Sequence, residues 1–93
     1  MTAEVRLPTL LRPSAGGASS VTVDGATVGE VLQALESTHP GLAGQVLTAD
    51  GSLHRFVNVY LNDDDVRYLE RLDTKVSDGD VVSILPAVAG GAS

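Results

Sequence analysis

One stretch of the chain has the pattern of an amphipathic helix, and this single helix restricts the folds open to the chain. Four apolar residues recur at the i, i+3, i+4 and i+7 spacing of one helical face. They are Val28, Val31, Leu32 and Leu35. Thr27 and Glu30 fit a capping box at the start of the stretch. Pro40 predicts its end, because proline cannot continue a helix.

The other regular segments have the two-residue alternation of β-strands. Strands are predicted over residues 4–7, 20–23, 55–61, 66–69 and 81–85. The segment that continues the first strand, residues 8–13, is less regular and predicts a sheet edge. Because one helix must bury its apolar face on another layer, the pattern predicts an α+β domain, a mixed sheet of four to five strands packed on one main helix.

The strand predicted over residues 55–61 has two different faces. Val57, Val59 and Leu61 alternate with Phe56, Asn58 and Tyr60. The aliphatic set is expected to face the helix, which leaves Phe56 and Tyr60 on the other face. Exposed apolar side chains of this kind indicate a partner-docking surface, and ordinary packing is the alternative.

Composition narrows the classes of function. The 93 residues are enough for one small domain, and they include no cysteine, which excludes disulfides, thiolate metal sites and a cysteine nucleophile. The net charge of -6 argues against nucleic acid as a partner, since phosphate binding needs a basic surface. No segment reaches the roughly 20 apolar residues of a membrane helix. No signal peptide is evident, and the expected location is cytoplasmic.

No set of residues predicts a catalytic or metal site. His39 and His54 are the only histidines, too few for a structural zinc site. Residues 63–65 are three aspartates, but the glycine and distal glutamate of a calcium loop are missing, so a solvated turn is expected. No serine lies in a nucleophile-elbow pattern. The chain is therefore predicted not to be an enzyme and to enter chemistry only as a carrier or substrate.

A diglycine, Gly90-Gly91, follows closely on the last predicted strand and on Pro86. We divide the chain into a domain of residues 1–86 and a C-terminal tail of residues 87–93. Because glycine has no Cβ, such a tail is slim enough to enter a narrow channel in another protein. A frayed tail without function is the alternative, since Gly16-Gly17 shows that a diglycine alone means little.

Four segments together resemble the ubiquitin-like sulfur carriers of the MoaD/ThiS family. They are Leu-Arg-Pro at 11–13, Leu-His-Arg-Phe-Val-Asn at 53–58, Val-Tyr-Leu-Asn-Asp-Asp-Asp-Val-Arg at 59–67, and the stretch 76–91 that ends Leu-Pro-Ala-Val-Ala-Gly-Gly. Within the family, the chain is most similar to actinobacterial carriers of cysteine biosynthesis. The resemblance covers nearly the whole chain and implies a β-grasp fold, with the first and last strands paired in the middle of the sheet.

The resemblance also implies a chemistry. An ATP-dependent, E1-like activating enzyme consumes ATP to adenylate the carboxylate of Gly91, and sulfide or a persulfide then displaces AMP to leave a thiocarboxylate. A sulfur-accepting synthase takes the sulfur, for cysteine or for another metabolite or cofactor. The carrier itself binds no cofactor. Leu85 matches an apolar family position that helps to dock the activating enzyme.

Ala92 and Ser93 depart from the family pattern, in which most members end at the diglycine. Some carriers of this type are processed by a JAMM-type zinc metalloprotease, so cleavage between Gly91 and Ala92 is expected. Two other functions stay open. The chain could be a protein modifier that forms isopeptide bonds through Gly91, or a noncatalytic interaction module with an inert tail.

Overall fold

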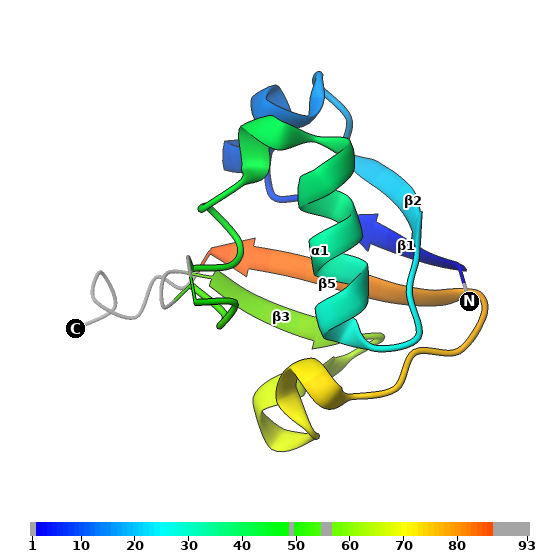
Figure 1. Ribbon diagram of the computed structural model, residues 1–93. Helices are drawn as coiled ribbons and strands as arrows, with labels where there is room; N and C mark the ends of the chain where they lie inside the picture. The colour runs from blue at the N-terminus through cyan, green and yellow to red at the C-terminus, as the bar shows by residue number, and fades with distance from the viewer. Residues whose placement is uncertain (1, 49, 55–56, 87–93) are drawn as a thin grey trace.

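The structure is a computed structural model that describes residues 2–48, 50–54 and 57–86. Five strands form one mixed sheet, and helix α1 crosses one of its faces (Figure 1). The strands are β1 (Thr2–Arg6), β2 (Ser20–Asp24), β3 (Val57–Leu61), β4 (Asp64–Asp65) and β5 (Asp80–Pro86); the helix α1 is Val28–Thr38. Four short 3-10 helices, η1 (Thr9–Ala15), η2 (Pro40–Leu42), η3 (Val66–Tyr68) and η4 (Arg71–Asp73), lie in the connections. The predicted α+β architecture is confirmed.

The first and last strands meet in the middle of the sheet, whose order is β2-β1-β5-β3-β4. β1 and β5 run parallel, from Ala3 opposite Asp80 to Arg6 opposite Ser83. β2 is antiparallel to β1, and β3 is antiparallel to β5. The β-grasp pairing implied by the resemblance is thus confirmed. The strand that leads to the predicted tail has a hydrogen-bonded neighbour on each side.

α1 begins and packs as its sequence predicts. The Thr27 hydroxyl accepts a hydrogen bond from the Glu30 backbone N–H at 3.2 Å, and such a cap is worth about 1 kcal/mol. The Glu30 carboxylate reaches back to the backbone N–H of Ala26 at 3.0 Å, one residue before its usual capping-box partner. The four residues of the apolar stripe, Val28, Val31, Leu32 and Leu35, are completely buried. This burial fixes α1 across the sheet.

The sheet and one connection complete the core. Buried side chains from three strands face α1: Ala3, Val5, Val59, Leu61, Val82 and Ile84. The connection between α1 and β3 adds Leu42, Val46 and Leu47, which are also buried. Aliphatic residues therefore build the core, and the other face of the sheet stays open.

The prediction of a strand over residues 66–69 is wrong. The chain turns at once after β3, because Asn62 adopts the left-handed conformation with φ of 57°, and β4 pairs Asp65 with Tyr60. The Asp65 carboxylate then accepts a hydrogen bond from the Arg67 backbone N–H at 2.9 Å. This side-chain cap starts η3 where the alternating sequence predicted a strand.

The sheet edge predicted over residues 8–13 is also wrong, because this segment enters η1. Pro8 has φ of -68° and accepts a hydrogen bond from the Leu11 N–H at 2.9 Å. Leu11 and Ala15, four positions apart, are buried against the core. Since these two face inward, their neighbour Leu10 faces outward and is 77% exposed.

Gly25 marks a close approach between the end of β2 and α1. A Cβ placed on Gly25 would lie 2.6 Å from the backbone nitrogen of Val31 and 2.8 Å from its Cγ2 atom. Gly25→Ala is therefore expected to lower the free energy of unfolding by about 2 kcal/mol, measured by urea denaturation.

Gly79→Ala is the control, because Gly79 has φ of +87° but no atom within 4 Å of its Cβ position. It is expected to cost about 1 kcal/mol through backbone strain alone. A Gly25→Ala protein at least as stable as the wild type would contradict the close approach.

Candidate functional site

β5 fixes the point from which the predicted tail begins. Its last residue, Pro86, lies opposite Val57 of β3. The predicted sulfur attachment at Gly91, its neighbour Gly90 and the predicted cleavage before Ala92 lie outside the described residues. The whole tail, residues 87–93, also lies outside the described residues. The candidate site is therefore built from the residues around the end of β5.

Two of the three predicted docking residues lie on the open face of the sheet. Val59 and Ile84 face α1, so the alternate residues of β3 and β5 face away from it. Tyr60, half-buried, and Leu85, 44% exposed, are among these alternate residues. The predicted orientation of Tyr60 is confirmed. Phe56, the third predicted docking residue, lies outside the described residues.

An ion pair borders the open face beside Tyr60. Asp65 lies opposite Tyr60 in the β3–β4 ladder, and only 8% of its side chain is exposed. The Arg67 Nη2 atom lies 2.9 Å from the Asp65 Oδ2 atom. The side-chain hydrogen bond from Arg67 is the main cause that holds the pKa of Asp65 below its usual value of 3.8. This pair holds the short strand β4 and η3 together.

Asp65→Asn is expected to lower the free energy of unfolding at neutral pH by about 1 kcal/mol, a small value because Arg67 is itself largely exposed. The lowered pKa of Asp65 stabilises the fold above the unfolded pKa of 3.8. This stabilisation is lost as the pH falls through the lower folded value. The difference in the free energy of unfolding between the variant and the wild type should therefore be smaller in acid, as measured by urea denaturation at about pH 7 and about pH 3.

Asp63→Asn, at an exposed turn position, is the control and should change stability by less than about 0.5 kcal/mol. The wild type should still lose some stability in acid through other carboxylates. Hydrogen bonds from Thr48 and from Thr2 lower the pKa values of Asp50 and Asp78, respectively. An Asp65→Asn effect that is the same at both pH values would contradict the assignment.

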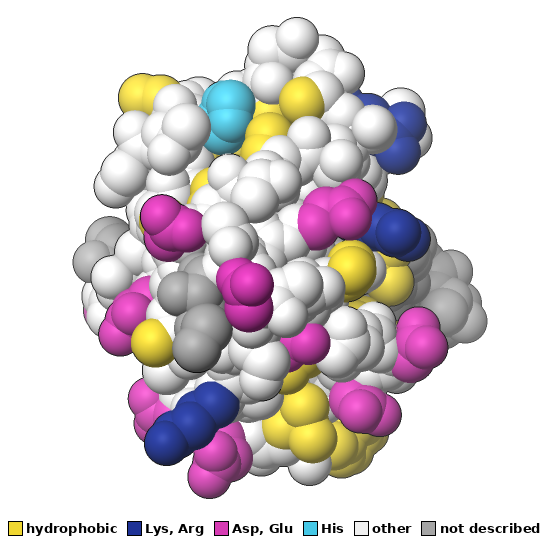
Figure 2. Space-filling view, turned by 90° about the vertical axis from the view of Figure 1, so that its right-hand side faces the viewer, with side chains coloured by type: hydrophobic (Ala, Val, Ile, Leu, Met, Phe, Trp, Pro, Cys, Tyr) yellow, Lys and Arg dark blue, Asp and Glu magenta, His cyan; other side chains and the backbone are white. Residues whose placement is uncertain are grey.

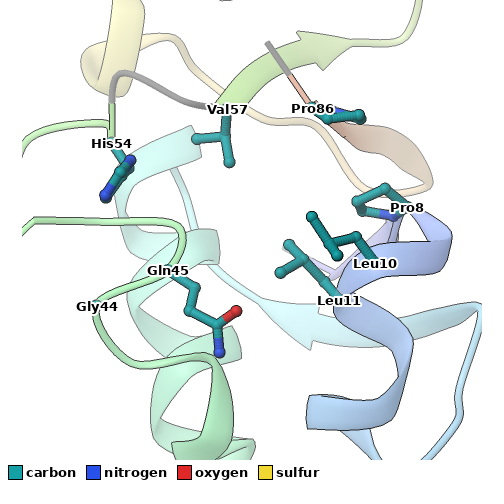
Figure 3. Close-up of a pocket in the computed structure, with 8 residues that line it drawn as sticks. All are labelled: Pro8, Leu10, Leu11, Gly44, Gln45, His54, Val57 and Pro86. Atoms are coloured by element: carbon teal, nitrogen blue, oxygen red, sulfur yellow. The ribbon is translucent and has the colours of Figure 1, made fainter. Parts of the chain in front are cut away.

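A small apolar pocket lies on the helix side of Pro86 (Figure 3). Its volume is about 210 Å³, and its lining residues are Pro8, Leu10, Leu11, Gly44, Gln45, His54, Val57 and Pro86. In Figure 3, Leu10 and Leu11 of η1 point toward the space below Val57 and Pro86. The His54 backbone N–H donates to the Val46 carbonyl at 2.9 Å, which ties the far wall together. The lining suits an aliphatic group rather than a charged one.

The described residues contain no group of three or more His, Cys, Asp and Glu side chains that could hold a metal ion. In the aspartate run 63–65, Asp65 is already engaged by Arg67. None of the helices in the described ranges is long and apolar enough to cross a membrane. What the structure presents is the end of a central strand bordered by apolar side chains.

The fold and this strand end define a small ubiquitin-like protein of the β-grasp class. The sequence pattern of the ThiS family matches residues 5–91. The chain belongs to the ThiS family. The proteins of this family that it is similar to are sulfur carriers rather than enzymes. It is 48% identical over 93 residues to the sulfur carrier protein CysO of Mycobacterium tuberculosis, covering 98% of this chain and 100% of the relative.

Solved structures support the assignment to this family. A chain of the Amycolatopsis orientalis BexX/CysO complex matches with a TM-score of 0.86 and 48% identity, over 96% of this chain and 99% of that one. SAMP1 of Haloferax volcanii matches with a TM-score of 0.82 and 34% identity, over 98% and 100% of the two chains. Small archaeal modifier protein 3 of the same organism is 47% identical over 68 residues, 73% of each chain.

Proposed function

We propose that this chain is a sulfur carrier whose Gly91 carboxylate is converted to a thiocarboxylate that donates sulfur in biosynthesis. The observation that carries the proposal is the 48% identity with CysO across nearly the whole chain. The position of β5 supports it, because this central strand leads directly toward Gly90 and Gly91. The sulfur acceptor that we propose first is the precursor of cysteine. Another sulfur-containing metabolite or cofactor is the alternative, and the partner enzyme decides between them.

The proposed chemistry begins with adenylation. A Gly91 carboxylate oxygen attacks the α-phosphorus of ATP in the activating enzyme, and pyrophosphate leaves. This step converts a poor electrophile into an acyl adenylate with a good leaving group. Sulfide then attacks the carbonyl carbon, AMP departs, and the thiocarboxylate remains. The chain itself supplies the slim tail, while the E1-like enzyme binds and consumes ATP.

The partners in this proposal meet the carrier around the end of β5. Leu85, Tyr60 and Phe56 are the proposed docking residues for the activating enzyme. A JAMM-type metalloprotease is proposed to cleave between Gly91 and Ala92, which makes Gly91 terminal. A sulfur-accepting synthase then receives the thiocarboxylate. The BexX/CysO complex supports direct contact between a carrier of this kind and a second protein.

A second function has a specific observation in its favour. Two relatives are named small archaeal modifier proteins, one of them 39% identical over 72 residues. A modifier would use the same adenylated Gly91, but a lysine amine rather than sulfide would attack the carbonyl carbon. The product would be an isopeptide bond to another protein. The two functions therefore differ in the nucleophile and not in the carrier's own residues.

Intact mass tests the proposal. The chain ending at Gly91 is incubated with the activating enzyme, ATP and sulfide, and is expected to exchange one oxygen for sulfur. A chain lacking Gly90 and Gly91 is the control and should stay unchanged. Attachment of the carrier to lysines in an extract, without the sulfur exchange, would favour the modifier. If the mass of this chain stayed unchanged with an enzyme that is active on another carrier, the noncatalytic interaction module with an inert tail would be the remaining function.

A further inference from the structure

A second apolar surface lies beside the end of β5, on the side of η1. A depression of about 570 Å³ separates η1 from β5. Leu10, 77% exposed, lines it from η1, and Leu85, 44% exposed, lines it from the strand. Pro8 and Pro86 belong to the same lining. Exposed apolar groups gathered around one strand end indicate a contact surface.

Two arginines line the same depression, and no acidic side chain does. Arg12 donates its Nε–H to the Leu7 carbonyl at 3.2 Å and makes no ion pair with a described residue. The Arg6 Nε atom lies 3.4 Å from the Glu4 Oε2 atom, but the two side chains are 63% and 42% exposed, so this pair contributes little. We call the six residues Arg6, Pro8, Leu10, Arg12, Leu85 and Pro86 the η1 patch.

The η1 patch is unusual for a chain with a net charge of -6. Figure 2 views the opposite end of the molecule, where β5 begins, and shows acidic side chains spread across that surface, with Lys and Arg side chains at its margins. Five aspartates lie in the turns or at the strand ends there: Asp24, Asp63, Asp64, Asp78 and Asp80. The lining of the depression beside η1, by contrast, includes Arg6 and Arg12 and, among the described residues, no acidic side chain. A partner surface rich in carboxylates would attract the η1 patch and repel the opposite end.

The short distance from Pro86 to Gly91 requires an enzyme that reacts with Gly91 to contact the carrier near the end of β5. Gly91 is the fifth residue after Pro86, and a fully extended chain of five residues spans at most about 18 Å. An enzyme that reacts with Gly91 inside a channel must therefore bring the mouth of the channel close to Pro86. The η1 patch includes Pro86, so it lies within reach of such a mouth.

We infer that the η1 patch docks the activating enzyme and that it fits a channel mouth with an apolar pocket for Leu10 bordered by Asp or Glu carboxylates for Arg6 and Arg12. This inference rests on the proposed function and extends the docking surface from the sheet onto η1. The charge of the patch also favours one orientation of the carrier on the enzyme, because it attracts the tail end of the carrier to an acidic channel mouth.

The test uses the chain ending at Gly91 and measures thiocarboxylate formation against carrier concentration. Leu10→Ser and Arg12→Glu are each expected to raise the KM for the carrier about tenfold and to leave kcat nearly unchanged, because contacts at the patch bind the carrier without touching the reacting atoms. Added salt should raise the KM of the wild type more than that of Arg12→Glu. Arg6→Glu is a second charge variant, needed because Arg12 also bonds to Leu7.

Matched controls separate docking from general surface effects. Tyr68→Ser removes an apolar side chain that is 85% exposed on η3, and Lys75→Glu reverses an exposed charge away from the patch. Both should keep the wild-type KM, and thermal unfolding should show that all variants are folded. A wild-type KM for folded Leu10→Ser and Arg6→Glu would overturn the inference. If the wild type itself were not converted, the proposed function would fail first.

A second copy of this chain is the competing occupant of the patch. Sedimentation of the wild type at assay concentrations decides between the two. A monomer supports docking of the enzyme. A dimer that Leu10→Ser dissociates would show that the patch is covered by another carrier and would overturn the inference.

Discussion

The chain that retains Ala92 and Ser93 is expected to form thiocarboxylate at least about a hundredfold more slowly than the chain ending at Gly91, because a displaced reacting group loses the benefit of precise positioning. In the longer chain the terminal carboxylate belongs to Ser93, and two side chains must enter a channel fitted to glycine. The measurement is intact mass over time with activating enzyme, ATP and sulfide.

A chain in which Ala92 and Ser93 are both changed to glycine separates the two causes. It should stay slow if the position of the carboxylate matters and should recover if the side chains block entry. Addition of a JAMM-type metalloprotease to the chain that retains Ala92 and Ser93 should restore the rate of the chain ending at Gly91, and a zinc chelator should prevent this. Equal conversion of the long and short chains would sink the processing step.

Leu85→Asp is expected to raise the KM of the activating enzyme for the carrier about a hundredfold, since it places a charge in the centre of the proposed apolar contact. Because Leu85 is already 44% exposed, the free energy of unfolding should fall by only about 1 kcal/mol. Leu69→Asp is a close control, because Leu69 is 42% exposed on a different segment. Equal effects of the two substitutions would contradict a docking role specific to Leu85.

The parts of the fold that the sequence predicted are those in which local and tertiary forces agree. The Thr27 cap and the stripe that includes Leu32 specify one helix, and that helix needs a sheet to cover it. The alternation in β3 correctly placed Val59 inward and Tyr60 outward. The pairing of β1 with β5 joins residues far apart in the chain, so it came from family resemblance and not from local pattern.

The errors arose where a side chain or a proline redirected the backbone. Val66 follows an alternating pattern, but the Asp65 carboxylate caps the Arg67 N–H and turns the chain into η3. Leu11 resembles an edge-strand residue, but its burial together with Ala15 favours η1. Both outcomes depend on hydrogen bonds and contacts that alternation and composition do not encode.

The candidate site was predicted in part. The orientation of Tyr60 followed from the alternation of β3, and an exposed Leu85 is compatible with docking. Leu10 and Arg12 were missed, although the signal was present: a leucine beside the buried pair Leu11 and Ala15 must face outward once the segment is helical. Their position beside Pro86 could come only from the tertiary structure.

The central place of β5 has a consequence for how this chain is made. A ribosome releases β1 before β5, yet Arg6 must pair with Ser83 before the sheet is complete. A polypeptide that stops before Asp80 lacks the middle strand, and with it the buried Val82 and Ile84. Such a fragment cannot close its core and is exposed to proteolysis. Every copy that folds therefore carries β5, the strand that leads toward Gly90 and Gly91 in the sequence.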